Sequence, residues 1–185
     1  ALDAIEAGYG SSTEFGINRI EHSTMARQDQ IARMKALNVE PSFLMNHVTL
    51  YGAAYRDQLF GPERASFMDP AGACVKENIR FTLHTDSPCS PLGSLGLVQT
   101  AVTRVCEFDN SVIGADQAVT VQRALEAVTI DAARQLGLAD RLGSIEEGKE
   151  ADFTILEDNP LTVDPSKIGS IKVSETWVNG EKKFG

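Results

Sequence analysis

Ile17-Asn18-Arg19-Ile20-Glu21-His22 is a short β-prone run, and the segments around it decide the fold of this chain. Apolar residues at helical spacing follow it and end near residue 37, with Ser23 or Thr24 as the candidate N-cap. Residues 39–47 then form a second apolar, β-prone run. A strand, a helix and a strand in this order predict a parallel β/α unit.

The same alternation continues towards the C-terminus. A third strand is predicted over residues 79–85, and helices are predicted over residues 95–105 and 120–135. The intervening residues 48–72 are rich in Gly, Pro and Arg, so we predict an irregular segment that is long enough to be a functional loop. The sequence therefore predicts an α/β fold with three neighbouring parallel strands.

The pattern changes after Gly137, where the helical spacing stops. Three short strand-like segments follow, over residues 143–145, 151–156 and 171–178. Asn179-Gly180 is a strong signal for a type I′ hairpin turn. We therefore predict a β/α part over residues 1–138 and a small all-β part over residues 139–185.

Length, charge and cysteine content limit the possible functions. The chain has 185 residues, fewer than the roughly 250 of a complete (β/α)₈ barrel. Its net charge of −9 argues against nucleic-acid binding, and it has no apolar run near the ~20 residues that a membrane helix requires. The three cysteines, Cys74, Cys89 and Cys106, form no paired motif, which favours reduced thiols in a cytoplasmic protein.

Three side chains that can bind metal ions stand at the predicted carboxyl ends of the strands: His22, His47 and Asp86. In a β/α barrel these strand ends meet at one face, so the three side chains should converge. His84 lies two residues before Asp86 and shares its face of the strand. Imidazole nitrogen and carboxylate oxygen are suitable ligands for Zn²⁺ or a similar divalent ion. The aspartate could also accept a proton from water whose pKa the metal lowers to about 7.

The same residues also have a purely structural interpretation. A histidine at the end of a strand, taken alone, is more often a satisfied polar residue than a metal ligand. Arg19 and Glu21 share the other face of the first strand, and we predict a structural ion pair between them. Spacing alone therefore leaves the metal site open.

Four motifs extend the interpretation, because together they resemble the amidohydrolase superfamily. Arg19-Ile20-Glu21-His22 resembles its strand-six motif, and His84-Thr85-Asp86-Ser87-Pro88 is similar to its strand-eight motif. Asn46-His47 matches the end of strand seven in the amidohydrolase-3 or exoenzyme-regulatory-like branch, and residues 142–153 resemble the entry into the family's β-sandwich. The resemblance implies the C-terminal part of a TIM-like (β/α)₈ barrel, strands six to eight, followed by part of a composite β-sandwich.

The resemblance also implies an activity, namely metal-dependent hydrolysis of C–N bonds in amide, N-acyl or cyclic amide groups of a small-molecule substrate. Asp86 would be a metal ligand and the general base. His22 would be a metal ligand or, in members with one metal ion, a base that orients water. His47 and His84 would face the substrate or support the ligands. The metal would be a divalent ion, with zinc expected.

The family's remaining ligands have no counterpart in this sequence: the strand-one His-x-His pair, the strand-four bridging residue and the strand-five histidine. Because zinc sites usually have three protein ligands and a water, these residues alone should bind metal weakly or not at all. Three strands of an open parallel sheet also leave uncovered edges, which predicts a homo-oligomer or a missing N-terminal half. A second hypothesis is therefore a catalytically silent, amidohydrolase-like binding or regulatory protein.

Overall fold

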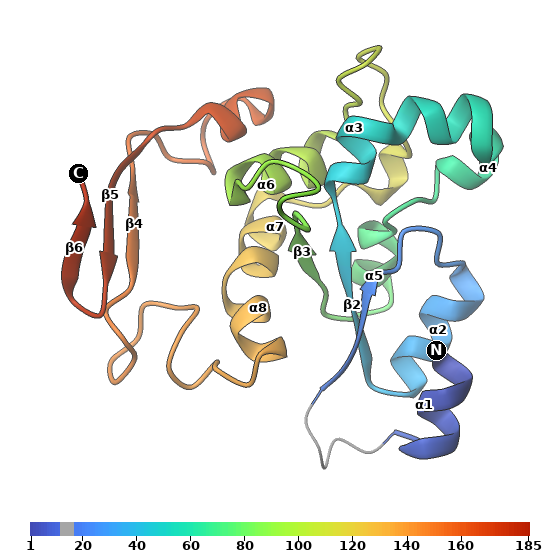
Figure 1. Ribbon diagram of the computed structural model, residues 1–185, viewed down its shortest axis with the longest axis horizontal. Coiled ribbons are helices and arrows are strands. Elements are labelled where there is room, and N and C mark those ends of the chain that lie inside the picture. The colour runs from blue at the N-terminus through green and yellow to red at the C-terminus, as the bar shows by residue number, and fades with distance from the viewer. Residues whose placement is uncertain (12–16) are drawn as a thin grey trace.

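A computed structural model describes residues 1–11 and 17–185 of the chain. Figure 1 shows a parallel sheet flanked by helices and a separate antiparallel sheet near the C-terminus. No helix within the two described ranges is both long and apolar enough to cross a membrane.

The parallel sheet contains β1 (Asn18–His22), β2 (Val39–Leu44) and β3 (Thr82–His84), in the order β1-β2-β3. His22 lies opposite Phe43 in the register of β1 and β2, so both strands end at the same edge. All of β2 is buried, as expected for a central parallel strand that is covered on both faces. The predicted α/β fold with three neighbouring parallel strands is confirmed.

Helices and helical turns flank this sheet, and several of them contribute buried apolar residues to one core. They are α1 (Leu2–Gly8), α2 (Gln28–Ala36), α3 (Asn46–Ala54), the π-helical turn η1 (Tyr55–Leu59), α4 (Gly61–Ala65), α5 (Ala71–Lys76), α6 (Ser94–Thr103), the 3₁₀ turn η2 (Ala115–Gln117), α7 (Val121–Val128) and α8 (Ile130–Gln135). Phe43, Phe81 and Val98 are fully buried in the resulting core. The sheet is thus held by the apolar burial that the sequence pattern predicted.

The prediction of an irregular segment over residues 48–72 was wrong, because α3, η1 and α4 occupy most of it. Pro62 lies in the first turn of α4, where its missing N–H removes no helical hydrogen bond. Pro70 directly precedes α5. These prolines begin helices, whereas we had interpreted the proline-rich composition as a sign of irregular structure.

The boundaries of β2 and α2 also differ from the prediction. β2 ends at Leu44 and α3 begins two residues later, so His47 lies in a helix and does not end a strand. α2 begins at Gln28, and neither Ser23 nor Thr24 is its N-cap. The backbone N–H of Arg27 donates to Gln30 Oε1 at 3.0 Å, which satisfies one donor at the start of the helix.

Three further segments differ from their predicted structure. The third strand, predicted over residues 79–85, shortens to residues 82–84. The helix predicted over residues 120–135 breaks at Thr129, whose φ of −124° and ψ of −95° are not helical. Residues 143–145 form no strand, and Ile145 is 83% exposed, so no apolar burial favours an extended conformation there.

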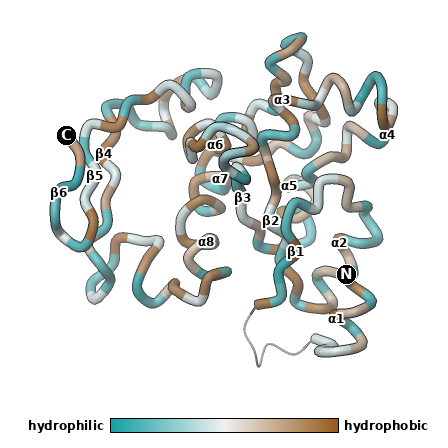
Figure 2. The backbone as a smooth tube through the Cα atoms, in the orientation of Figure 1, coloured by the Kyte–Doolittle hydropathy of each residue, from teal (hydrophilic) through white to brown (hydrophobic). Residues whose placement is uncertain are grey.

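The antiparallel sheet contains β4 (Phe153–Leu156), β5 (Val173–Val178) and β6 (Glu181–Phe184). Asn179 and Gly180 join β5 to β6 with φ values of 52° and 77°, which confirms the predicted type I′ turn. Figure 2 shows β6 as largely hydrophilic, in keeping with its fully exposed pattern. The 3₁₀ turn η3 (Pro165–Ser170) packs against α6, where the Gly169 N–H donates to Gln99 Oε1 at 2.8 Å.

Candidate active site

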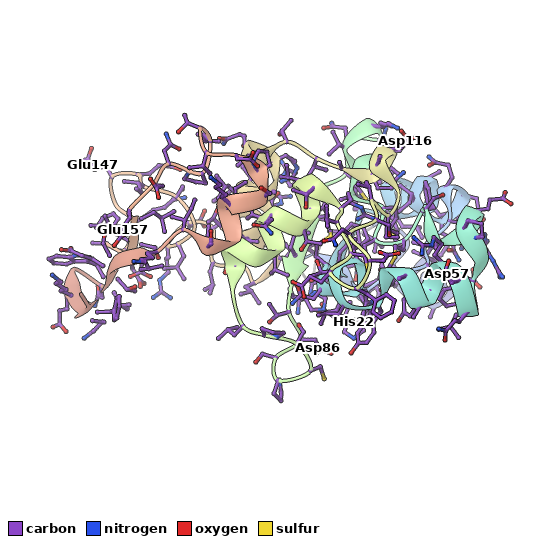
Figure 3. The ribbon with its side chains drawn as sticks, turned by 90° about the horizontal axis from the view of Figure 1, so that it is seen from above. His22, Asp57, Asp86, Asp116, Glu147 and Glu157 are labelled. Carbon is purple, nitrogen blue, oxygen red and sulfur yellow. The ribbon has the colours of Figure 1, made fainter. Side chains whose placement is uncertain are left out.

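His22 and Asp86 come together at the carboxyl edge of the parallel sheet. His22 is the last residue of β1, and Asp86 lies two residues beyond the end of β3. His22 Nε2 lies 3.6 Å from Asp86 Oδ2, and the two side chains are 47% and 44% exposed. Figure 3 shows both side chains at the same edge of the molecule. A nitrogen donor and an oxygen donor are therefore close together and open to a ligand.

The backbone around this pair adopts a conformation that is uncommon for residues with side chains. His22, Ser23 and Asp86 have φ values of 65°, 51° and 53°. Left-handed backbone at non-glycine residues costs energy and is found preferentially at functional sites. The Asp86 carbonyl accepts a hydrogen bond from the Cys89 N–H at 2.8 Å, which helps to hold the turn. The fold thus maintains a strained backbone at the two side chains predicted to bind metal.

A chain of hydrogen bonds orients the His22 ring. His22 Nδ1 lies 3.0 Å from His84 Nε2, and His84 Nδ1 lies 2.9 Å from the Ser42 hydroxyl. The rings of His22 and His84 stack, with centroids 5.1 Å apart and planes at 28°. The chain begins on β2 at Ser42 and ends at the exposed His22, so the centre of the sheet positions the outermost ring.

Two proton arrangements satisfy this chain. In one, His84 Nδ1–H donates to Ser42 and His22 Nδ1–H donates to His84, which leaves the lone pair of His22 Nε2 free for a metal ion. In the other, every donor is reversed and His22 Nε2–H points towards Asp86. Histidines that bind metal usually donate their second N–H to a fixed acceptor. The first arrangement therefore matches a metal ligand, and the second a histidine–carboxylate pair.

Burial lowers the pKa of His84, and the neighbouring His22 acts in the same direction. A lowered pKa favours the neutral ring, which has one donor nitrogen and one acceptor nitrogen. Only the neutral ring of His84 can accept from His22 while it donates to Ser42.

His47 approaches the same pair of histidines from α3. Its Nδ1 lies 2.9 Å from the Thr24 hydroxyl, and its ring centroid lies 6.3 Å from that of His22, with the planes at 84°. Burial lowers the pKa of His47, and His22 and His84 add to this effect. The structure thus brings together all four predicted site residues: His22, His47, His84 and Asp86.

Two fully buried ionisable residues, Asp69 and Arg104, support the segment at Thr24 through backbone hydrogen bonds. The guanidinium of Arg104 donates to the carbonyls of Met68 at 2.6 Å, Asp69 at 3.2 Å and Ile113 at 2.9 Å. The Asp69 N–H donates to the Thr24 carbonyl at 2.7 Å. Neither carboxylate oxygen of Asp69 makes a hydrogen bond of good geometry among the described residues, and the Thr24 hydroxyl is the nearest donor to favour the ionised carboxyl. Burial raises the pKa of Asp69 to about 7, against the opposing effects of Arg104 and Thr24.

We expect Asp69→Asn to remove a pH-dependent contribution to stability. Because the folded pKa of about 7 lies above the ordinary 3.8, this contribution is present at low pH and is lost as pH rises towards 7. Burial lowers the pKa of Arg104 to about 10 and raises the pKa of Tyr55. Both groups therefore stay protonated below pH 8, with Arg104 charged and Tyr55 neutral.

Urea unfolding between pH 5 and pH 8 measures this effect. The wild-type protein should lose roughly 1–3 kcal/mol relative to the Asn variant over that range. A stability difference that stays constant with pH would contradict the raised pKa.

The donor set at the strand ends fits part of a metal site. Within residues 1–11 and 17–185, no group of three or more His, Cys, Asp and Glu side chains is arranged to hold a metal ion. His22 and Asp86 supply one nitrogen and one oxygen 3.6 Å apart. Two ligands of a tetrahedral zinc ion at about 2.0–2.1 Å would lie roughly 3.3 Å apart, close to this spacing.

A sequence model of the amidohydrolase family matches residues 1–182. The chain belongs to the amidohydrolase family. An N-substituted formamide deformylase from Arthrobacter pascens is 27% identical over a match that covers 99% of this chain and 34% of the deformylase. The chain spans about a third or less of the length of the first curated relatives that it matches.

Solved structures agree with this family assignment. An uncharacterized metal-dependent hydrolase from Pyrococcus horikoshii is 28% identical, with a TM-score of 0.72 over 89% of this chain and 32% of the hydrolase. An adenosine deaminase from Xanthomonas campestris with bound zinc is 22% identical, with a TM-score of 0.64 over 99% of this chain and 42% of the deaminase. The second likeness shows a shared fold.

Several residues of this candidate site were not identified from the sequence. Ser42 is a polar residue in a buried strand, a pattern that could have indicated a buried hydrogen bond. Thr24 was interpreted only as a helix cap. No sequence signal pairs Asp69 with Arg104, which are 35 positions apart. The ion pair predicted on the first strand is confirmed, with Arg19 Nε 2.5 Å from Glu21 Oε1.

Proposed function

We propose that this chain is the C-terminal part of a metal-dependent amidohydrolase that cleaves C–N bonds in amide, N-acyl or cyclic amide groups of small molecules. The observation that carries the proposal is the approach of His22 Nε2 to Asp86 Oδ2 at 3.6 Å, at the carboxyl edge of a parallel sheet. Functional groups of β/α barrels gather at this edge. Family membership and a relative named as a metal-dependent hydrolase support the same conclusion.

The proposal assigns the two sheets to two parts of a larger protein. β1, β2 and β3 would be barrel strands six to eight within residues 1–138, and the antiparallel sheet would be part of a composite β-sandwich within residues 139–185. The bound zinc of the X. campestris relative supports zinc as the metal. His22 and Asp86 would hold it, with further ligands from protein outside these 185 residues. A divalent metal ion, when bound, supplies polarisation of the substrate carbonyl and lowers the pKa of the attacking water to about 7.

The residues of this chain would then perform the proton transfers. Asp86 would accept the proton of the attacking water at Oδ1, the oxygen that does not hold the metal ion, and would deliver that proton to the leaving nitrogen. Its half-exposed position leaves room for both groups. His84 and Ser42 hold the His22 ring through their hydrogen bonds, so that its Nε2 faces Asp86. His47 faces the same space and contacts the substrate.

Metal analysis combined with hydrolysis assays of the full-length protein tests this function. We expect zinc to co-purify, and a panel of formyl, acyl and cyclic amides to include a substrate. Removal of the metal by a chelator should lower turnover at least about tenfold, and added zinc should restore it. His22→Ala should lower metal content, whereas Cys89→Ser, a change at an exposed neighbour of Asp86, should not. A metal-free protein that hydrolyses nothing in the panel would contradict the proposal and favour the catalytically silent alternative.

A further inference from the structure

Three aromatic side chains line one face of the continuous helix formed by α3 and η1: His47, Tyr51 and Tyr55. Their spacing of four residues places them one above the other. The ring centroids of His47 and Tyr51 are 5.8 Å apart, as are those of His47 and Tyr55. Tyr51 and Tyr55 are 6.2 Å apart with planes at 21°. We refer to these three rings as the aromatic wall.

The aromatic wall lies beside the buried side of α3, with Tyr55 packed against the core and Tyr51 exposed. Val48, Gly52 and Ala53 form the buried side of the helix, and a Cβ at Gly52 would lie 2.7 Å from Ile113. Tyr51, in contrast, is 45% exposed. Tyr51 therefore keeps nearly half of its surface accessible beside the His47 ring.

The wall begins at the proposed catalytic centre. The His47 ring stands edge-on to His22 at 6.3 Å, and the Thr24 hydroxyl holds His47 Nδ1 at 2.9 Å. The Tyr51 and Tyr55 rings both lie beside the His47 ring. A group attached next to the carbonyl of a substrate bound between His22 and Asp86 would lie against these rings.

The wall carries no free charge from its own helix. Arg56, the nearest guanidinium in the chain sequence, is held by Asp57 at 2.6 Å and Asp109 at 2.8 Å. Aromatic rings prefer offset-stacked or edge-to-face neighbours with centroids about 4.5–7 Å apart. The near-parallel Tyr51 and Tyr55 rings extend this arrangement, and the exposed part of Tyr51 is accessible to a further ring. The chemistry of the surface therefore favours a neutral, planar group.

We propose that the aromatic wall is a substrate subsite that binds a neutral, planar ring carried next to the C–N bond that is cleaved. Tyr51 is its main specificity residue, since it combines the greatest exposure with stacking on Tyr55. This assignment of a substrate class rests on the proposed function, because it places the reacting carbonyl at His22 and Asp86.

Binding of two neutral amides to the full-length, metal-loaded protein tests the subsite independently of turnover. Benzamide and cyclohexanecarboxamide carry the same amide group on a planar and a non-planar ring. Calorimetry should give a Kd for benzamide that is roughly three- to tenfold lower. Tyr51→Leu should abolish this preference, while Tyr51→Phe should keep it. Tyr9→Leu, which changes an exposed tyrosine after α1, is the matched control.

The outcomes separate the subsite from the proposed function. The protein could bind benzamide preferentially, lose this preference in Tyr51→Leu and yet hydrolyse no amide. That result would support the aromatic wall as a binding subsite and would refute the proposed function. The subsite proposal would be refuted by an active enzyme that binds the two amides equally well and has equal kcat/KM for aryl and cyclohexyl substrates. That result would leave the proposed function intact. The comparison of the two amides in the wild-type protein decides the matter even if a variant fails to fold.

Discussion

Asp86→Asn should lower kcat by roughly 10²- to 10⁴-fold while changing KM much less. Asparagine has nearly the same shape as aspartate but cannot accept a proton at the carboxyl position. The variant therefore removes the proposed general base and keeps the volume of the side chain. The backbone at residue 86 should also persist, since asparagine tolerates the left-handed conformation observed there.

Steady-state kinetics of the full-length enzyme on the best amide of the panel measure this effect. Metal content must be measured in the same samples, because Asp86 is also a proposed ligand and its loss could empty the site. Asp116→Asn provides the control, as an exposed carboxylate that Figure 3 shows far from Asp86. An Asp86→Asn variant with full metal content and unchanged kcat would refute the general-base role.

Arg104→Met should destabilise the protein by about 3–5 kcal/mol, because buried acceptors that lose their donor each cost about 1–3 kcal/mol. The variant leaves three backbone carbonyls without their donor and removes the positive charge that favours the ionised form of the Asp69 carboxyl. Methionine fills much of the same volume, so a cavity contributes little to the loss. The ability of Asp69 to take up a proton, with its pKa near 7, limits the cost of the remaining charge.

Urea unfolding of Arg104→Met, Asp69→Asn and the double variant separates these effects. The double variant should recover part of the stability, because it leaves no buried charge. Arg27→Met is a suitable control, since Arg27 and Asp29 form an exposed ion pair that should contribute little to stability. A loss as small for Arg104→Met as for Arg27→Met would show that the buried Arg104 side chain does not stabilise the fold.

Much of the fold was predictable because its determinants are local in the sequence. The alternation of strand and helix, which indicates the parallel sheet, is visible in single segments such as residues 17–22. The turn at Asn179-Gly180 depends only on the backbone freedom of two neighbouring residues. Family membership likewise follows from contiguous motifs.

Boundaries between elements were less predictable. The sequence did not reveal that β2 ends at Leu44, or that residues 48–72 are largely helical. Leu44, Met45 and Val48 are apolar and buried in either conformation, so their hydrophobicity does not distinguish the end of a strand from the start of a helix. His47 was therefore recognised as a candidate but assigned to the wrong element.

The sequence by itself determined which side chains could perform chemistry and that His22 and Asp86 follow parallel strands. Only the tertiary structure decided what surrounds these side chains. It brings together the Ser42–His84–His22 chain, the contact of Arg104 with the Asp69 carbonyl and the aromatic wall beside His22. Ser42 and His84 are 42 positions apart, and Arg104 and Asp69 are 35 positions apart. Contacts at such separations depend on how whole helices and strands pack together, and that packing leaves no local pattern in the sequence.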